Sequence, residues 1–170
     1  MPPSGLDGGP LSSHVIGAAL ERIAAASDWS VLHDLPKRDA SWSNPRRALL
    51  VVNHREHFSL LLLDTSVRPP TYAHLCSSGL ALPGRFQAEL TARGATECTP
   101  LDVARACRDN ECGFFVLAYA EAAQAACGPD VRLADAMGRG ALSEYMPTLN
   151  ERAIAIRRQE LRRIAAEARR

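Results

Sequence analysis

The apolar positions of the chain form runs that predict strands in its middle third. Residues 48–52 and 58–63 are short and almost wholly apolar, the pattern of sheet strands that are covered on both faces. The polar link between them, residues 53–57, is short enough to make the two strands a hairpin. A third strand is expected over 71–75, and a last extended piece near 95–103.

Helical patterns predict the remaining regular structure. Three segments carry apolar residues at helical intervals or in a run too long for a strand: 14–26 after a Ser12 or Ser13 cap, 83–93 before Gly94, and 114–126. A capping box, Thr148-x-x-Glu151, opens a fourth helix that runs to the end of the chain. Residues 27–46 are mixed and turn-rich, and no element is predicted there.

These elements together predict an α+β fold, with a small central mixed sheet of about four or five short strands and a helix packed against it. A length of 170 residues suits one domain, expected over 11–170 after a flexible Pro/Gly-rich tail at 1–10. The core is expected to be lined by Val51, Leu61, Leu63, Phe115, Val116 and Tyr119.

Composition and charge exclude several classes of protein. Apolar residues make up 46% and charged residues 23%, which excludes bulk disorder, collagen and coiled coil, and no apolar run is long enough for a membrane span. The net charge of +1, from 20 basic and 19 acidic residues, gives no overall field that would recruit nucleic acid. The C-terminal arginines are interleaved with Glu160, Glu167 and apolar residues such as Ile156. This pattern predicts a half-buried helix with a solvated face, and a partner-binding stripe is the alternative. We expect no nucleic-acid and no membrane partner.

Cysteine usage points to a reducing compartment. Five cysteines at irregular spacings indicate free thiols rather than a disulfide framework. Residues 1–10 lack the basic and apolar regions of a secretory signal. We therefore expect an intracellular monomer, in the cytoplasm or nucleus, that uses no cofactor. His54 and His57 with a distant cysteine could bind zinc, but a structural site needs four clustered ligands, so no metal is predicted.

Cys112 and His57 are the residues best placed for chemistry. Cys112 stands where the polar turn 108–111 enters a helix, so backbone N–H groups and the positive end of the helix dipole would surround its sulfur. Gly113 would let a substrate carbonyl approach the backbone closely. His57 begins a strand that would hold its ring towards a cleft, as the base for a thiol nucleophile. The alternatives are a buried structural cysteine and a surface hairpin histidine.

The sequence around both residues resembles a known protease family. Two segments, EHFSLLLLD at 56–64 and DNECGFFVL at 109–117, are similar to the histidine and cysteine blocks of the Ulp/SENP group. This group comprises the ubiquitin-like-protein-specific cysteine proteases that cleave SUMO and its relatives. LVVN at 50–53 is similar to the strand before the family's catalytic histidine, and LSSHVI at 11–16 to its N-terminal block. The resemblance covers about residues 10–165.

The resemblance implies an Ulp/SENP-like cysteine protease fold and a role for individual residues. Cys112 would be the nucleophile and His57 its base, facing each other across a cleft. Phe58, which stands where the family has a tryptophan, and Gly113 would contact the substrate.

The chain departs from the family at the positions that support the cysteine and the histidine. The family's acidic residue should fall within 72–78, which reads YAHLCSS and contains no carboxylate. His74 would instead orient His57 as a neutral partner, with Cys76 as the alternative. No glutamine stands near 105–107 to donate to the oxyanion, and Pro10 takes the place of an N-terminal tryptophan. These departures predict activity below that of the family.

Three functions are open at this stage. The resemblance implies a thiol protease or isopeptidase that acts on the C-terminal tail of a ubiquitin-like, SUMO-like modifier. A catalytically impaired pseudoprotease would keep the fold as a binding module for a ubiquitin-like protein or another partner. An acyltransferase on the same scaffold is the third possibility. The sequence does not name the modifier.

Overall fold

A five-stranded mixed sheet lies at the centre of the molecule. The computed structural model describes residues 9–35, 46–55, 57–100, 103 and 109–167. The sheet order is β1-β2-β3-β4-β5; the outer pairs β1–β2 and β4–β5 are parallel, and the inner pairs are antiparallel. The strands are β1 (Trp29–Leu32), β2 (Arg47–His54), β3 (His57–Asp64), β4 (Thr71–Leu75) and β5 (Thr96–Glu97).

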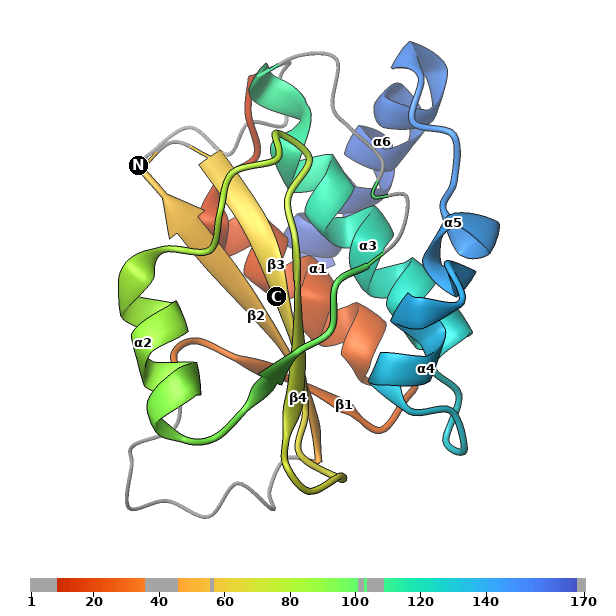
Figure 1. Cartoon of the computed structure of the whole chain (residues 1–170). Coiled ribbons are helices and arrows are strands. Elements are labelled where there is room, and N and C mark those ends of the chain that lie inside the picture. The colour runs from red at the N-terminus through yellow and green to blue at the C-terminus, as the bar shows by residue number, and fades with distance from the viewer. Residues whose placement is uncertain (1–8, 36–45, 56, 101–102, 104–108, 168–170) are drawn as a thin grey trace.

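Helices cover both faces of this sheet (Figure 1). One face packs against α1 and α3, with α6 outside α1, and the shorter α2 lies on the opposite face (Figure 1). The helical elements are α1 (Ser13–Ala24), α2 (Gly84–Ala92), the 3-10 turn η1 (Asp109–Glu111), α3 (Cys112–Ala126), α4 (Leu133–Gly138), α5 (Ala141–Tyr145) and α6 (Glu151–Glu167). The predicted α+β fold with its small mixed sheet is confirmed.

The β2–β3 hairpin forms as predicted, and its turn is shorter than the polar link suggested. His54 pairs with His57, so the turn begins directly after His54. Arg55 takes a φ of 61°, the left-handed conformation that tight hairpin turns require. The two histidines therefore lie at one end of the sheet, on neighbouring strands.

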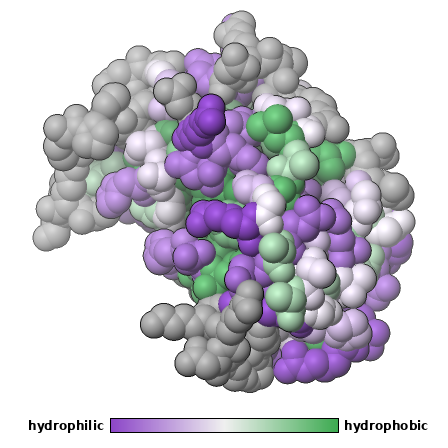
Figure 2. Space-filling view, turned by 60° about the vertical axis from the view of Figure 1, so that its left-hand side comes forward, coloured by the Kyte–Doolittle hydropathy of each residue, from purple (hydrophilic) through white to green (hydrophobic). Residues whose placement is uncertain are grey.

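Strand β3 is buried on both faces, and its alternate residues enter two different cores. Leu60 and Leu62 lie in the large core with α1 and α3, whereas Leu61 and Leu63 lie in the smaller core with Phe86 of α2. The continuous apolar run in the sequence follows from this double coverage. On the side of the molecule that carries α2, hydrophilic and hydrophobic residues are interspersed at the surface (Figure 2).

The apolar run 114–126 forms a buried helix, as its length predicted. Helix α3 begins at Cys112, and Phe114, Phe115, Val116 and Tyr119 are all buried. Of the expected core residues only Val51 is half-buried; it packs against the edge of the large core.

Helices α1 and α6 pack side by side. In α6, two details differ from what the sequence predicted. In α6 the buried side chains are Ile154 and Leu161, while Ile156 is 50% exposed, because it lies about 200° around the helix from Ile154. The Asn150 side chain accepts the Ala153 N–H at 2.9 Å and caps this helix, rather than the predicted Thr148. Among the described helices, none has the length and apolar content needed to cross a membrane.

The sequence analysis missed three short elements. Strand β1 has only four residues, and it owes its place to parallel pairing with β2 rather than to its own pattern. Helices α4 and α5 have six and five residues, too few turns to produce a helical period in the sequence. Conversely, the extended piece expected near 95–103 contributes only the two residues of β5 to the described sheet.

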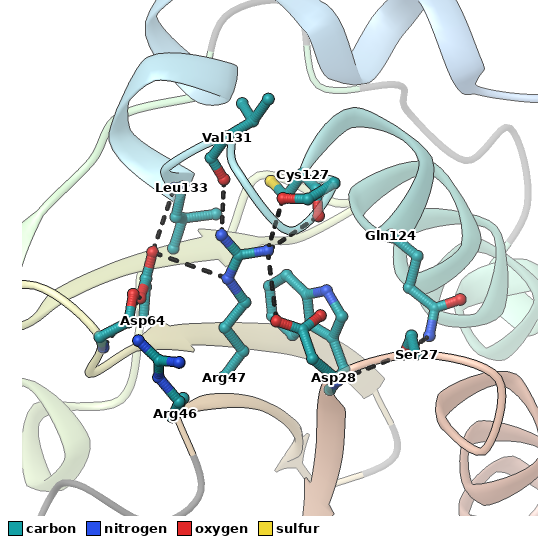
Figure 3. Close-up of polar contacts among 12 residues, drawn as sticks. Ser27, Asp28, Arg46, Arg47, Asp64, Gln124, Cys127, Val131 and Leu133 are labelled. Atoms are coloured by element: carbon teal, nitrogen blue, oxygen red, sulfur yellow. Dashed lines mark hydrogen bonds and ion pairs between the residues drawn. The ribbon is translucent and has the colours of Figure 1, made fainter.

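A buried arginine ties the end of the sheet to the end of α3 (Figure 3). Arg47 is 3% exposed and forms ion pairs with Asp64 at 3.9 Å and Asp28 at 3.7 Å. Its guanidinium also donates hydrogen bonds to three main-chain carbonyls, those of Cys127 (2.9 Å), Gly128 (2.9 Å) and Val131 (2.6 Å). Asp64 in turn accepts the N–H of Leu133 at 3.2 Å. The guanidinium of Arg47 and the carboxylate of Asp64 thus both have partners, because a buried charge is stable only when it is paired and hydrogen-bonded.

We expect Arg47→Ala to lower the free energy of unfolding by about 3–5 kcal/mol, because it leaves the buried Asp64 carboxylate without its counter-charge and three carbonyls without their donor. Urea unfolding followed by circular dichroism measures this loss. Arg46→Ala is the matched control, since Arg46 is the exposed neighbour and the change should cost less than about 0.5 kcal/mol. Equal losses in the two variants would contradict the anchoring role of Arg47.

Candidate functional site

His57 is held at the first position of β3, where the hairpin turn enters the sheet. Its side chain is half-buried, and its Nε2 lies 3.2 Å from the Sγ of Cys76. The other ring nitrogen, Nδ1, lies 3.5 Å from the Ser78 hydroxyl. Both ring nitrogens therefore face polar groups from the segment that follows β4.

Cys112 lies beside the start of β3, at the first residue of α3. The Phe58 N–H donates to its Sγ at 3.5 Å, which brings the thiol to the residue next to His57. Burial raises the pKa of the Cys112 thiol, while the backbone N–H groups of Phe58, Gly113 and Cys112 itself act in the opposite direction. The negative charge that Cys76 could carry raises the pKa further. Burial outweighs these N–H groups, so the pKa of the thiol lies above its ordinary value.

His74 does not take the position expected for it beside His57. Its Nε2 lies 2.8 Å from the hydroxyl of Ser59, a fully buried residue that also lies 3.1 Å from the Nε2 of His54. Cys76, the alternative residue, is the one in contact with His57. The expectation that His74 orients His57 directly is therefore corrected.

The register of β3 and β4 explains this correction. His74 pairs with Leu61, which is four residues along β3 from His57, or about 13 Å. Continuing the same antiparallel register past Leu75 brings the segment 76–78 alongside the start of β3. Counting along the sequence from His57 could not distinguish the two positions, whereas the strand register does.

The histidines around Ser59 are neutral groups. Burial, together with the positive charges that His54 and His57 can carry, lowers the pKa of His74 to about 4. Burial and His57 likewise lower the pKa of His54. These side chains therefore supply hydrogen bonds to the site without supplying charge.

The structure gives Phe58 and Gly113 packing roles that the sequence analysis did not foresee. Phe58 is buried in the large core. A Cβ at Gly113 would lie 3.0 Å from Leu11 Cβ and 3.0 Å from Ile16 Cδ1, so any larger residue here would push against α1 and against Leu11, which precedes it. Contact of Phe58 and Gly113 with a substrate stays a prediction. The expected oxyanion position at 105–107 lies outside the described residues.

Within the described ranges, histidine, cysteine, aspartate and glutamate side chains form no group of three that could hold a metal ion. The Cys76, Cys98, Cys112 and Cys127 thiols are all free of disulfide bonds. The arrangement therefore offers two thiols at one end of β3: Cys76, in contact with the His57 imidazole, and Cys112, whose sulfur accepts the N–H of Phe58 at the start of α3.

Comparison with known proteins gives structural neighbours but no sequence relatives. No protein-family model and no curated protein sequence matches the chain. The Ulp1-like SUMO protease catalytic domain of Chaetomium thermophilum superposes with a TM-score of 0.57 at 16% identity, over 89% of this chain and 70% of that one.

Two structures of Ulp1 are similar in the same way. SUMO protease Ulp1 with its catalytic cysteine oxidised to a sulfinic acid gives a TM-score of 0.53 at 12% identity, over 84% of this chain and 82% of that one. The C-terminal Ulp1 protease domain in complex with Smt3, the yeast ortholog of SUMO, gives 0.52 at 11% identity, over 84% and 77%. The chain has the fold of the Ulp1 protease domain.

The neutral state of His74 predicts a pH-dependent stability. The unfolded chain protonates this imidazole near its ordinary pKa of 6.5, whereas the folded protein does so only near about 4, so stability falls as pH falls through this window. We expect His74→Gln to remove about 1–2 kcal/mol of the stability loss between pH 7 and pH 5, because glutamine has no proton to take up there.

Urea unfolding at the two pH values measures this difference. His14→Gln, a change at an exposed histidine of α1, is the control and should keep the wild-type pH dependence. The same pH dependence in wild type and His74→Gln would mean that His74 is not held neutral by the fold.

Proposed function

We propose that this protein is a thiol protease or isopeptidase that acts on the C-terminal tail of a ubiquitin-like, SUMO-like modifier. The observation that carries the proposal is the contact of the Cys112 Sγ, at the start of α3, with the N–H of Phe58, the residue that follows His57 in β3. The shared fold supports it, because the structural neighbours with this architecture are SUMO proteases.

The proposed reaction follows from the groups around Cys112. His57 takes the Cys112 proton, and the thiolate attacks the carbonyl carbon of the modifier's last residue. The backbone N–H groups at the start of α3 stabilise the oxyanion. His57 then gives its proton to the leaving amine, and water hydrolyses the thioester to release the modifier and restore the thiol.

A binding module without catalysis is the second candidate. It is favoured by the contact of His57 with a thiol in place of a carboxylate, and by burial, which raises the pKa of Cys112. In a triad, loss of the acidic member costs on the order of 10⁴ in turnover, although a cysteine nucleophile depends on it less. The same surface would then hold a ubiquitin-like protein without cleaving it.

A ubiquitin-like protein with an electrophile in place of its C-terminal carboxylate distinguishes the two candidates. We expect incubation with a SUMO vinyl sulfone to add one modifier covalently to the wild-type protein, visible as a shift on a denaturing gel, because the thiolate of Cys112 attacks the electrophile. Cys112→Ala should lose the adduct entirely. Cys98→Ala, a change at a half-buried thiol next to β5, is the control and should keep it.

Stable binding of the modifier without any adduct, in wild type and Cys112→Ala alike, would favour the binding module. An adduct that survives Cys112→Ala would sink the assignment of Cys112 as the nucleophile.

A further inference from the structure

The hydroxyl of Ser77 is a buried polar group without a hydrogen bond. Ser77 lies in the segment after β4 and is 2% exposed, and its Oγ has no hydrogen-bond partner in the described part of the chain. We propose that this hydroxyl faces Cys112 and donates a hydrogen bond to the oxygen that becomes negatively charged when Cys112 attacks a carbonyl carbon. This inference rests on the proposed function, because it concerns the transition state of that reaction.

A buried hydroxyl without a partner calls for an explanation. Such a group has lost its hydrogen bonds to water and has gained none in return, so native proteins pair nearly all of them. A partner that arrives only with the substrate would explain the exception. Two other unpartnered groups on the strands, in Trp29 and Thr71, belong to residues that pair with Arg47 and Asp64 at the opposite end of the sheet. Ser77 differs from them because it lies at the end with the thiols.

The neighbours of Ser77 indicate where its side chain points. The Cys76 sulfur lies 3.2 Å from one ring nitrogen of His57, and the Ser78 hydroxyl lies 3.5 Å from the other. Side chains two residues apart on an extended segment share a face, and the one between them points to the other face. The side chain of Ser77 is therefore directed away from the His57 ring.

The strand register indicates what lies on that other face. Leu75 pairs with Leu60, and both side chains enter the large core that β3 shares with α3. Two residues further along, the same register sets Ser77 opposite Phe58, whose side chain enters the same core. The contact of Ser78 with His57 agrees with this register, since it places those two residues opposite each other.

Cys112 reaches the same place from the helix. Its side chain belongs to the large core, and its Sγ accepts the N–H of Phe58 at 3.5 Å. The Ser77 hydroxyl and the Cys112 thiol therefore both approach Phe58, one from the segment after β4 and the other from the start of α3. A carbonyl group bonded to the sulfur would have its oxygen within reach of this hydroxyl.

The hydroxyl would act on the tetrahedral intermediate. When the sulfur bonds to the carbonyl carbon, the π electron pair of the C=O bond moves to the oxygen. Ser77 donates a hydrogen bond to this oxygen and keeps its own proton. The C=O bond then re-forms, and the amine leaves with the proton that Cys112 lost. A hydrogen bond that strengthens as the charge develops lowers the barrier without tightening substrate binding.

The experiment separates carbonyl chemistry from the thiol and from the fold. A SUMO with a nitrile in place of its C-terminal carboxylate adds reversibly to a thiol: the S–C bond forms, the nitrogen takes the electron pair and then the proton, and nothing leaves. Its affinity is compared with that of unmodified SUMO. Alkylation of Cys112 by iodoacetamide, located by mass spectrometry, involves no oxyanion. Urea unfolding reports stability, and cleavage of a fluorogenic SUMO amide gives kcat and KM.

Ser77→Ala should change only the steps that place charge on the carbonyl oxygen or nitrile nitrogen. We expect kcat to fall about 100-fold with KM unchanged, and the nitrile to bind at least about tenfold more weakly while unmodified SUMO binds as before. The alkylation rate of Cys112 and the urea midpoint should stay at their wild-type values, because the free protein loses no hydrogen bond. Ser143→Ala, at an exposed serine of α5, is the control and should match wild type throughout.

Two results would overturn the inference: equal nitrile affinity in wild type and Ser77→Ala, or a lower urea midpoint and slower alkylation that accompany the weaker binding, as a structural role would give. If the nitrile gains affinity through Ser77 but no SUMO amide is cleaved, the inference stands and the proposed function fails. If Ser77→Ala cleaves the amide as fast as wild type, the proposed function stands and the inference fails. A nitrile that wild type binds no better than unmodified SUMO would contradict both.

Discussion

The buried ion pair of Arg47 and Asp64 fixes the relation between the sheet and its main helix. The two residues pair across β2 and β3, and Arg47 also binds the carbonyls that follow the end of α3 (Figure 3). The 15 residues of α3 form a rigid rod of about 22 Å. This anchor and the packing of α3 against β3 in the large core together place the other end of the helix, with Cys112, beside the start of β3.

The two ends of β3 differ sharply in their electrostatics. Asp64 at one end is charged, fully buried and completely hydrogen-bonded, and its role is structural. At the other end, the described side chains in contact with His57 include the Cys76 thiol and the Ser78 hydroxyl, and burial lowers the pKa of the nearby His54 and His74. These described contacts are hydrogen bonds between uncharged groups, whereas Asp64 is held by an ion pair as well.

Local patterns in the sequence were sufficient to predict the elements that carry Cys112 and His57. The apolar runs of β2 and β3, with a polar break between them, predicted the hairpin that begins β3 at His57. The turn before Cys112 and the long apolar run after it predicted the helix start. Strand β1 and helices α4 and α5 were not predicted, because each is too short to show a hydrophobic period. Tertiary packing, rather than local sequence preference, stabilises them.

Position 76 shows why the sequence identifies the segments around Cys112 and His57 but not the residue that contacts His57. The environments of Cys112 and His57 are set by neighbours in the sequence, at a helix start and a hairpin turn. The third partner depends instead on the register between β3 and β4, and hence on the connection between Asp64 and Thr71, whose conformation no local pattern specifies. His74 and Cys76 are two residues apart and share a face of the strand, so periodicity alone cannot choose between them. The register does distinguish them, and it places the thiol of Cys76, rather than the imidazole of His74, in contact with His57.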